Sequence, residues 1–216
     1  MTIFDNDFLP LLFDFLDRQA PWYPLSDDDL SILWGNAINS EKQQVGQDIH
    51  VVEKLSADQI SQYRNAMKKA AVNSIKALFD NLSINTVEDR CIMVEWLLSE
   101  SDASNEAVDG SKNKGRKNPQ FYYDDIRSDD SRIGIFQSYP IKVTFATHLM
   151  AIKGVPEPLQ PEVYPVGTLV MSVQAVKHVL LCYKTGELVE SQGRCRTSRE
   201  TIGRIMRWSL PTTKRS

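Results

Sequence analysis

SADQISQYRNAMKKAAVNSIKALFDNL, residues 56–82, decides the fold of this 216-residue chain. Apolar side chains recur in it every three or four residues, the spacing of one face of an α-helix. These residues are Ile60, Tyr63, Met67, Ala70, Ala71, Ile75, Leu78 and Leu82. Ser56 and Gln59 match a capping box, so we expect a helix that begins at Ser56. A helix this long with one apolar face must pack on other elements, and it predicts a helical first half.

Three further helices are expected around it. Residues 8–16 form a short, very apolar helix with Pro10 near its first turn, where proline is tolerated. Ser26 precedes three aspartates, which favours a helix start because hydroxyl caps and acids stabilise that end. Residues 87–98 form the third helix, behind Thr86 as its cap.

The second half carries a different pattern. Residues 141–149, IKVTFATHL, alternate apolar and polar positions and predict a strand, paired with 132–138 through a break at Tyr139-Pro140. Four prolines over 155–166 favour an extended crossing. Over 169–183 we favour a helix capped by Thr168 and stopped by Gly186. The competing interpretation is a strand pair turning at residues 184–187.

The expected fold class is therefore mainly α with a small β component (α+β), with a helical N-terminal half and a mixed C-terminal half. We expect an acidic helical region over residues 1–99 and a basic mixed α/β region over 121–216. Residues 100–120 between them are poor in hydrophobic residues and rich in Ser, Asn, Gly, Asp and Lys. This composition favours a flexible linker.

Composition places the chain among folded, water-soluble proteins. It is 42% hydrophobic and 25% charged. Three cysteines without a CxxC spacing favour a reducing compartment. The N-terminus carries acids among its hydrophobic residues, which is not typical of a secretory signal. No apolar run approaches the roughly 18 residues of a membrane span. We expect no membrane contact and a cytoplasmic location, or a nuclear one in a eukaryote.

The formal net charge of −3 hides a division along the chain. Residues 1–110 hold 8 Lys and Arg against 19 Asp and Glu, whereas residues 111–216 hold 17 against 9. From Gly193 to the end there are seven basic residues against one glutamate. Such asymmetry indicates contact with nucleic acid or a membrane surface, or attraction between copies.

An arginine-rich segment near the C-terminus is the first candidate binding site. Residues 193–208, GRCRTSRETIGRIMRW, contain Arg194, Arg196, Arg199, Arg204 and Arg207. Thr197 and Glu200 form a second capping box, so a helix is expected. At about 100° per residue the arginines gather on one side, and Ile202, Ile205 and Met206 on the other. Guanidinium groups suit phosphate oxygens. The alternative is a surface helix whose arginines only solvate it or pair with acids.

A second basic cluster precedes three aromatic residues, Phe121, Tyr122 and Tyr123. Its members are Lys112, Lys114, Arg116 and Lys117. Basic residues next to aromatic ones occur in single-strand binding, where rings stack on bases. The alternative, a solvated loop before core aromatics, is favoured. A helix-turn-helix from residues 169–184 and 197–208 fits poorly because the connection is too long.

Cofactor, metal and catalytic signals are weak. Four aspartates, Asp124, Asp125, Asp129 and Asp130, match no calcium loop, and a solvated acidic turn is favoured. His178 and Cys182, four residues apart, are too few to hold zinc. The chain contains no GxxxxGK[ST], GxGxxG, HExxH or GxSxG motif. We predict no cofactor, no metal site and no catalytic residue.

The leading hypothesis is a non-catalytic protein that binds nucleic acid, mostly without sequence preference, in packaging or assembly. The alternative is a protein-interaction or self-assembly module without nucleic acid, in which the arginine face meets the aspartates at 27–29 of a second copy. An enzyme is the third hypothesis. A deep pocket where Asp124, Asp125, His148 or His178 converge would favour it.

Overall fold

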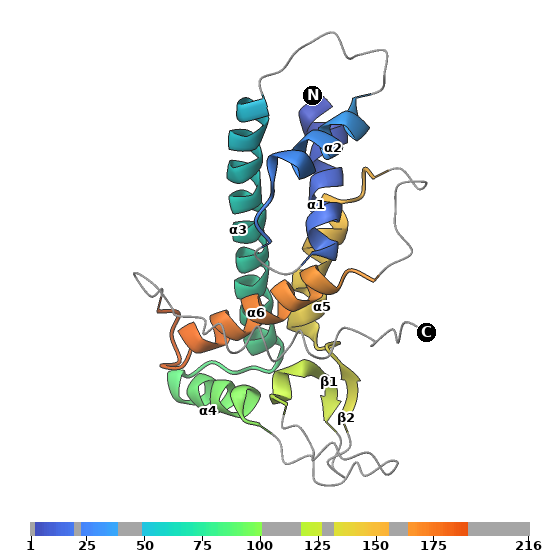
Figure 1. Ribbon diagram of the computed structural model, residues 1–216. Helices are drawn as coiled ribbons and strands as arrows, with labels where there is room; N and C mark the ends of the chain where they lie inside the picture. The colour runs from blue at the N-terminus through green and yellow to red at the C-terminus, as the bar shows by residue number, and fades with distance from the viewer. Residues whose placement is uncertain are drawn as a thin grey trace, which may run out of the picture.

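The computed structural model describes residues 3–19, 23–38, 49–100, 118–126, 132–155 and 164–189. These residues form helices and one small antiparallel sheet, which confirms the expected class of mainly α with a small β component. One long helix, α3 (Ile49–Asn81), runs upright through the molecule. Helices α1 and α2 lie along its upper part, and α5 lies along its middle and lower part (Figure 1). Helix α6 crosses it, and α4 lies at its base with the sheet.

Helix α3 confirms most of the expected apolar stripe but neither its expected start nor its last member, because Leu82 lies after the end of the helix and is 51% exposed. Ile60, Tyr63, Met67, Ala71 and Ile75 are all buried. The helix begins seven residues before Ser56, whose hydroxyl instead donates a hydrogen bond to the Val52 carbonyl at 2.6 Å. Val52 is itself buried among the N-terminal helices, so packing extends the helix past the capping box.

The N-terminal helices form as the sequence predicts. A π-helical segment, η1 (Phe4–Phe8), leads into α1 (Leu9–Arg18), which has Pro10 in its first turn. Helix α2 (Asp27–Ala37) begins with a complete capping box. The Asp29 amide donates to Ser26 Oγ at 3.1 Å, and the Ser26 amide donates to the Asp29 carboxylate at 3.0 Å. These elements share a core with the first half of α3.

The base of the molecule contains α4 and a hairpin. Helix α4 (Val87–Leu98) has the expected cap, because the Asp89 amide donates to Thr86 Oγ1 at 3.0 Å. A 3-10 turn, η3 (Gln120–Tyr122), leads into β1 (Tyr123–Ile126), which pairs antiparallel with β2 (Arg132–Ile135). In this register Tyr123 lies opposite Ile135 and Asp125 opposite Ile133.

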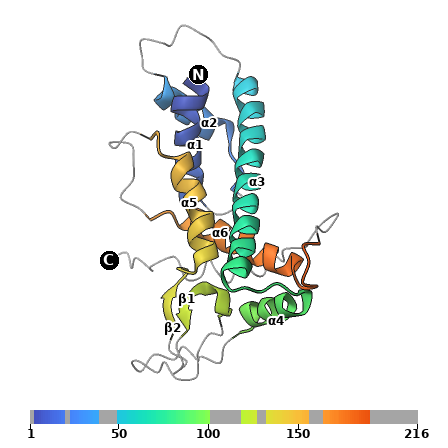
Figure 2. The same cartoon turned by 180° about the vertical axis from the view of Figure 1, so that it is seen from behind.

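The strand expected over residues 141–149 is wrong, because this segment lies in helix α5 (Tyr139–Ala151). Pro140, interpreted as a break between strands, occupies the first turn of the helix. Its buried side chains, Ile141, Thr144 and His148, follow helical spacing rather than alternation. Helix α5 packs on α3 and α6, and this burial overrides the β-propensity of its branched residues (Figure 2). The strand β2 therefore pairs with β1 instead.

The favoured helix over 169–183 is confirmed as α6 (Val166–Cys182), with Pro165 rather than Thr168 at its cap. Gly186 adopts the expected left-handed conformation, with φ at 77°. Helix α6 contacts α1, α3, α4 and α5, and none of its residues is exposed. It joins two cores, one around α1, α2 and the start of α3, the other around the end of α3 and α4. The boundaries of the three expected regions stay a prediction.

Candidate functional site

All nine residues expected to bind nucleic acid lie outside the described residues. The first cluster is Lys112, Lys114, Arg116 and Lys117; the second is Arg194, Arg196, Arg199, Arg204 and Arg207. The helix expected after Thr197 lies outside them too. Their role in binding phosphate therefore stays a prediction. The structure instead shows two other constellations, one apolar and one polar.

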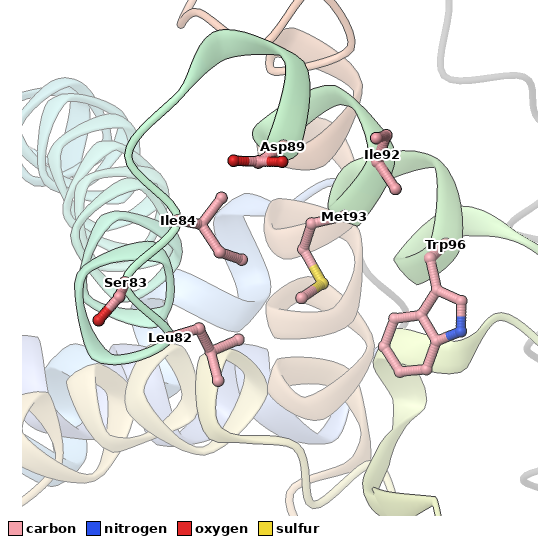
Figure 3. Close-up of a pocket in the computed structure, with 7 residues that line it drawn as sticks. All are labelled: Leu82, Ser83, Ile84, Asp89, Ile92, Met93 and Trp96. Carbon is pink, nitrogen blue, oxygen red and sulfur yellow. The ribbon is translucent and has the colours of Figure 1, made fainter.

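The first is an apolar groove at the base of the molecule, between the end of α3 and α4 (Figure 3). Its volume is about 590 Å³, and its lining residues are Leu82, Ser83, Ile84, Asp89, Ile92, Met93 and Trp96. Figure 3 shows Ile84 and Met93 turned toward each other across the hollow. Ser83, with φ at 56°, turns the chain out of α3, and the Ile84 amide donates to the Phe79 carbonyl at 2.9 Å. This turn fixes the near wall of the groove.

The opposite wall of the groove is formed by α4, which is apolar on two faces. Val94 and Leu97 are buried in the core. Ile92 and Trp96, one turn apart on the other side, are 66% and 45% exposed. This exposed pair was not predicted from the sequence, although its spacing four residues apart within VEDRCIMVEWLL is the signal that would have found it.

Carboxylates border this exposed apolar face. Glu88, Asp89 and Glu95 are all exposed on α4. The single arginine of the helix, Arg90, points elsewhere: its Nε lies 3.4 Å from the Ile84 carbonyl and its guanidinium 5.9 Å from the Phe79 ring centroid. The groove thus combines an apolar floor with a negative rim. Such a surface suits a basic amphipathic segment, and it lacks converging titratable groups for catalysis.

The second constellation is a buried chain of polar side chains that joins four helices. Tyr63 Oη of α3 lies 2.9 Å from His148 Nδ1 of α5 and 3.4 Å from Thr168 Oγ1 of α6. Asp17 of α1 accepts a hydrogen bond from the Thr168 amide at 3.0 Å, and its other oxygen lies 3.4 Å from His148 Nε2. His148 and Thr168 are fully buried.

The phenol of this chain remains protonated. Burial raises the pKa of Tyr63 well above its ordinary value of 10.0. When this hydroxyl donates to Nδ1 of His148, the ring proton lies on Nε2, facing the Asp17 carboxylate. The approach of Nε2 to Asp17 lacks hydrogen-bond geometry, so the hydrogen bonds of Tyr63 with His148 and of Thr168 with Asp17 are the contacts that fix the mutual position of the four helices.

Helix α6 approaches the end of α1 closely beside this chain. A Cβ on Gly167 would lie 2.4 Å from the Gln19 carbonyl oxygen and 2.5 Å from that of Asp17. Only glycine permits this approach, which brings the Thr168 amide onto the Asp17 carboxylate. The polar chain is therefore built into the packing of α6, away from any open surface.

Three of the four side chains considered for an enzyme, those of Asp124, His148 and His178, have separate partners. Asp124 forms an ion pair of 2.7 Å with Lys142, and His148 belongs to the buried chain. His178 Nε2 lies 3.7 Å from Cys182 Sγ. Burial, and then the nearby positive charge of Lys68, lower the pKa of His178. Within the described residues no group of three or more His, Cys, Asp or Glu side chains could hold a metal ion. Asp129 and Asp130 lie outside them.

The acidic N-terminus of α2 was the expected partner surface for the arginines of a second copy. Asp27 and Asp28 are exposed there. Asp29 is engaged, because it accepts hydrogen bonds from the Ser26 amide and hydroxyl, and the Tyr23 hydroxyl lies 3.3 Å away. These contacts with Ser26 lower the pKa of Asp29. Two of the three aspartates therefore present their carboxylates to solvent.

Comparisons with known proteins identify a family. None of the helices in the described ranges is long and apolar enough to cross a membrane. No curated protein and no solved structure matches the chain. Residues 23–207 match a family described as a domain of unknown function, DUF6532, and this match includes the groove, most of the buried polar chain and the arginine-rich segment. The chain belongs to the DUF6532 family.

Proposed function

We propose that this protein binds nucleic acid without catalysing a reaction, through the arginines of residues 193–215, in the cytoplasm or a nucleus. One observation carries the proposal: from Gly193 onward there are seven basic residues against one glutamate, although the whole chain has a net charge of −3. Guanidinium groups bind phosphate oxygens through paired hydrogen bonds, so a segment of this kind suits a polyanion. Lys112, Lys114, Arg116 and Lys117 add a second basic cluster.

The described body supports this role as a scaffold. Its groove is apolar with a negative rim, and its buried polar chain is closed to solvent, so neither offers an open pair of titratable groups. The acidic body also repels phosphate, which confines contact to the basic segments. Binding is then mainly electrostatic and independent of base sequence.

The test compares two triple variants that remove the same charge. Arg199→Gln, Arg204→Gln and Arg207→Gln are made together in the full chain. The control replaces three lysines that are exposed on α3, Lys54, Lys69 and Lys76, by glutamine. Fluorescence anisotropy with labelled single-stranded and duplex DNA and RNA gives the affinity of each protein.

We expect the parent to bind at moderate salt. The arginine variant should bind at least about tenfold more weakly, because each arginine that no longer meets a phosphate reduces the electrostatic contribution. The lysine variant should stay within about twofold of the parent. Absence of binding by the parent, or an equal loss of affinity in the control, contradicts the proposal.

A second function, self-assembly without nucleic acid, is favoured by the exposed carboxylates of Asp27 and Asp28. In this case the basic segment of one copy meets the N-terminus of α2 in another. Light scattering of nucleic-acid-free protein should then show association that weakens as salt rises. Asp27→Asn with Asp28→Asn should abolish it, and an unchanged mass across salt concentrations excludes this function.

A further inference from the structure

We propose that the groove between α3 and α4 is the docking site of this chain's own residues 196–208. In this arrangement Ile202, Ile205 and Met206 lie against the groove floor, and most of the arginines point outward. The contact is intramolecular, so it stands whether or not the arginines bind a polyanion.

The floor of the groove provides the apolar contact. Leu82, Ile92 and Trp96 are 51%, 66% and 45% exposed, and they surround one hollow rather than being scattered over the surface. Exposed apolar groups gathered in one groove mark an interaction surface. An amphipathic helix binds such a groove through side chains spaced three or four apart. Ile202, Ile205 and Met206 have this spacing.

The rim of the groove provides charge complementarity. Glu88, Asp89 and Glu95 are exposed around the apolar face of α4, whereas residues 196–208 carry four arginines and one glutamate. At about 100° per residue, Arg199 falls beside Met206 at the edge of the apolar side of the segment. Its guanidinium is placed to meet a carboxylate of the rim. The other three arginines, Arg196, Arg204 and Arg207, fall on the opposite side and stay available to an anion.

The course of the chain after α6 brings this segment to the groove. Gly186 packs against α4, since a Cβ there would lie 2.3 Å from the Val87 carbonyl oxygen. Cys91 Sγ lies 3.5 Å from the Lys184 carbonyl, and the Val189 amide donates to the Cys182 carbonyl at 3.1 Å. Residues 184–186, just after α6, therefore lie beside the first turns of α4, and Val189 lies against the end of α6 three residues later.

The length of the connection fits. The 12 residues of α4 make a helix about 18 Å long. Residues 190–195 can span up to about 20 Å when extended, so residue 196 can reach any part of the groove. A short tether of this kind gives an effective concentration on the order of millimolar. The segment of the same chain therefore occupies the groove ahead of a second copy.

Hydrogen–deuterium exchange of the full chain tests the inference. Ile92→Glu places a charge in the groove at a side chain that is 66% exposed, so the fold tolerates it. Ile32→Glu, on α2, is the matched control because Ile32 is 64% exposed. Ile202→Glu with Ile205→Glu removes the apolar side of the segment without touching the body. Far-UV circular dichroism confirms that each variant is folded.

We expect amides of residues 196–208 to exchange at least about tenfold more slowly in the parent than in an unstructured peptide. Ile92→Glu and the double isoleucine variant should remove this protection, and Ile32→Glu should keep it. Fast exchange in the parent overturns the inference, as does protection that survives Ile92→Glu. If the protection disappears on dilution and sedimentation shows a dimer, the groove binds a second copy, and this result also overturns the inference of intramolecular docking.

The outcome of the exchange experiment does not depend on whether the protein binds nucleic acid. Exchange is measured on protein freed of nucleic acid by a high-salt wash, so failure to bind a polyanion leaves the expected protection unchanged. Conversely, absence of protection with retained anisotropy binding refutes the docking and leaves the nucleic-acid proposal standing. The two failures are therefore distinguishable.

Discussion

Replacing Tyr63 by phenylalanine should destabilise the fold by removing one hydroxyl from the buried polar chain. The phenylalanine ring keeps the stacking on Phe13, whose centroid lies 4.6 Å away, so no large cavity forms. The change leaves Nδ1 of the fully buried His148 without the hydroxyl partner that lies 2.9 Å from it. Nε2 of this ring has only the contact of 3.4 Å to Asp17.

The expected cost follows from the unsatisfied ring nitrogen. A buried polar atom that loses its partner costs about 1–3 kcal/mol. For a chain of this size each kcal/mol lowers the melting temperature by roughly 2–4 °C, so a loss of about 2 kcal/mol corresponds to about 4–8 °C. Urea unfolding followed by far-UV circular dichroism measures the change in free energy directly.

Tyr164→Phe is the matched control, because Tyr164 is 85% exposed and its hydroxyl is open to water. It should shift the free energy of unfolding by less than about 0.5 kcal/mol. If Tyr63→Phe is as stable as the parent or this control, the polar chain does not hold the four helices in the way we describe.

Four further substitutions test the packing and the electrostatics. Gly167→Ala should cost about 1–3 kcal/mol of stability because its Cβ would meet carbonyl oxygens at 2.4 and 2.5 Å. Gly35→Ala is the control, because Gly35 lies in α2 with nothing within 4 Å of the new Cβ, and it should raise the free energy of unfolding by up to about 1 kcal/mol. If the two variants shift the melting temperature in the same direction, this reasoning is contradicted. The pKa of Asp29 is lowered in the folded protein. Its contribution to stability is therefore present above the ordinary pKa of 3.8 and is lost as pH falls through the pKa of the folded state. Urea midpoints of the parent should therefore fall more steeply than those of Asp29→Asn below about pH 5, and parallel profiles would exclude the contribution. His178 should titrate below its ordinary pKa of 6.5 by NMR, and Lys68→Gln should raise the value; an unchanged titration would rule out the role of this lysine.

Elements with strong local signals could be predicted from the sequence. The caps at Ser26 and Thr86 are short hydroxyl side chains followed by acids, and both begin helices as expected. The apolar stripe of α3 was long enough to identify its buried face. Gly186 was found as the left-handed stop after α6. Each of these depends on interactions within a few residues.

Elements determined by distant contacts could not be predicted in the same way. Residues 141–149 alternate like a strand, but α3 and α6 bury Ile141, Thr144 and His148 on one helical face. The start of α3 is likewise set by the packing of Val52 rather than by the capping box at Ser56. Local propensity spans only about 1 kcal/mol, which burial of a few side chains exceeds.

The site was predictable only in part. The basic segments are evident from composition, because charge requires no fold to be counted. The groove was not predicted, since Ile92 and Trp96 resemble core residues until the packing of Val94 and Leu97 shows which side of α4 faces inward. The buried chain joins side chains that are up to about 150 residues apart in the sequence, so no sequence motif could reveal it. Its members are Asp17, Tyr63, His148 and Thr168.

The salt dependence of polyanion binding tests the central claim most directly. Anisotropy titrations at several salt concentrations give the slope of log K against log salt for the parent and for the variant with Arg199, Arg204 and Arg207 replaced by glutamine. We expect a linear fall whose slope in the variant is smaller by roughly one and a half to three units, because each neutralised phosphate accounts for about 0.7–0.9 units of slope. Arg204 and Arg207 meet phosphates in either case, and Arg199 adds a third contact when it is not held at the rim of the groove. Equal slopes, or no binding by the parent at low salt, would show that these arginines do not meet phosphate.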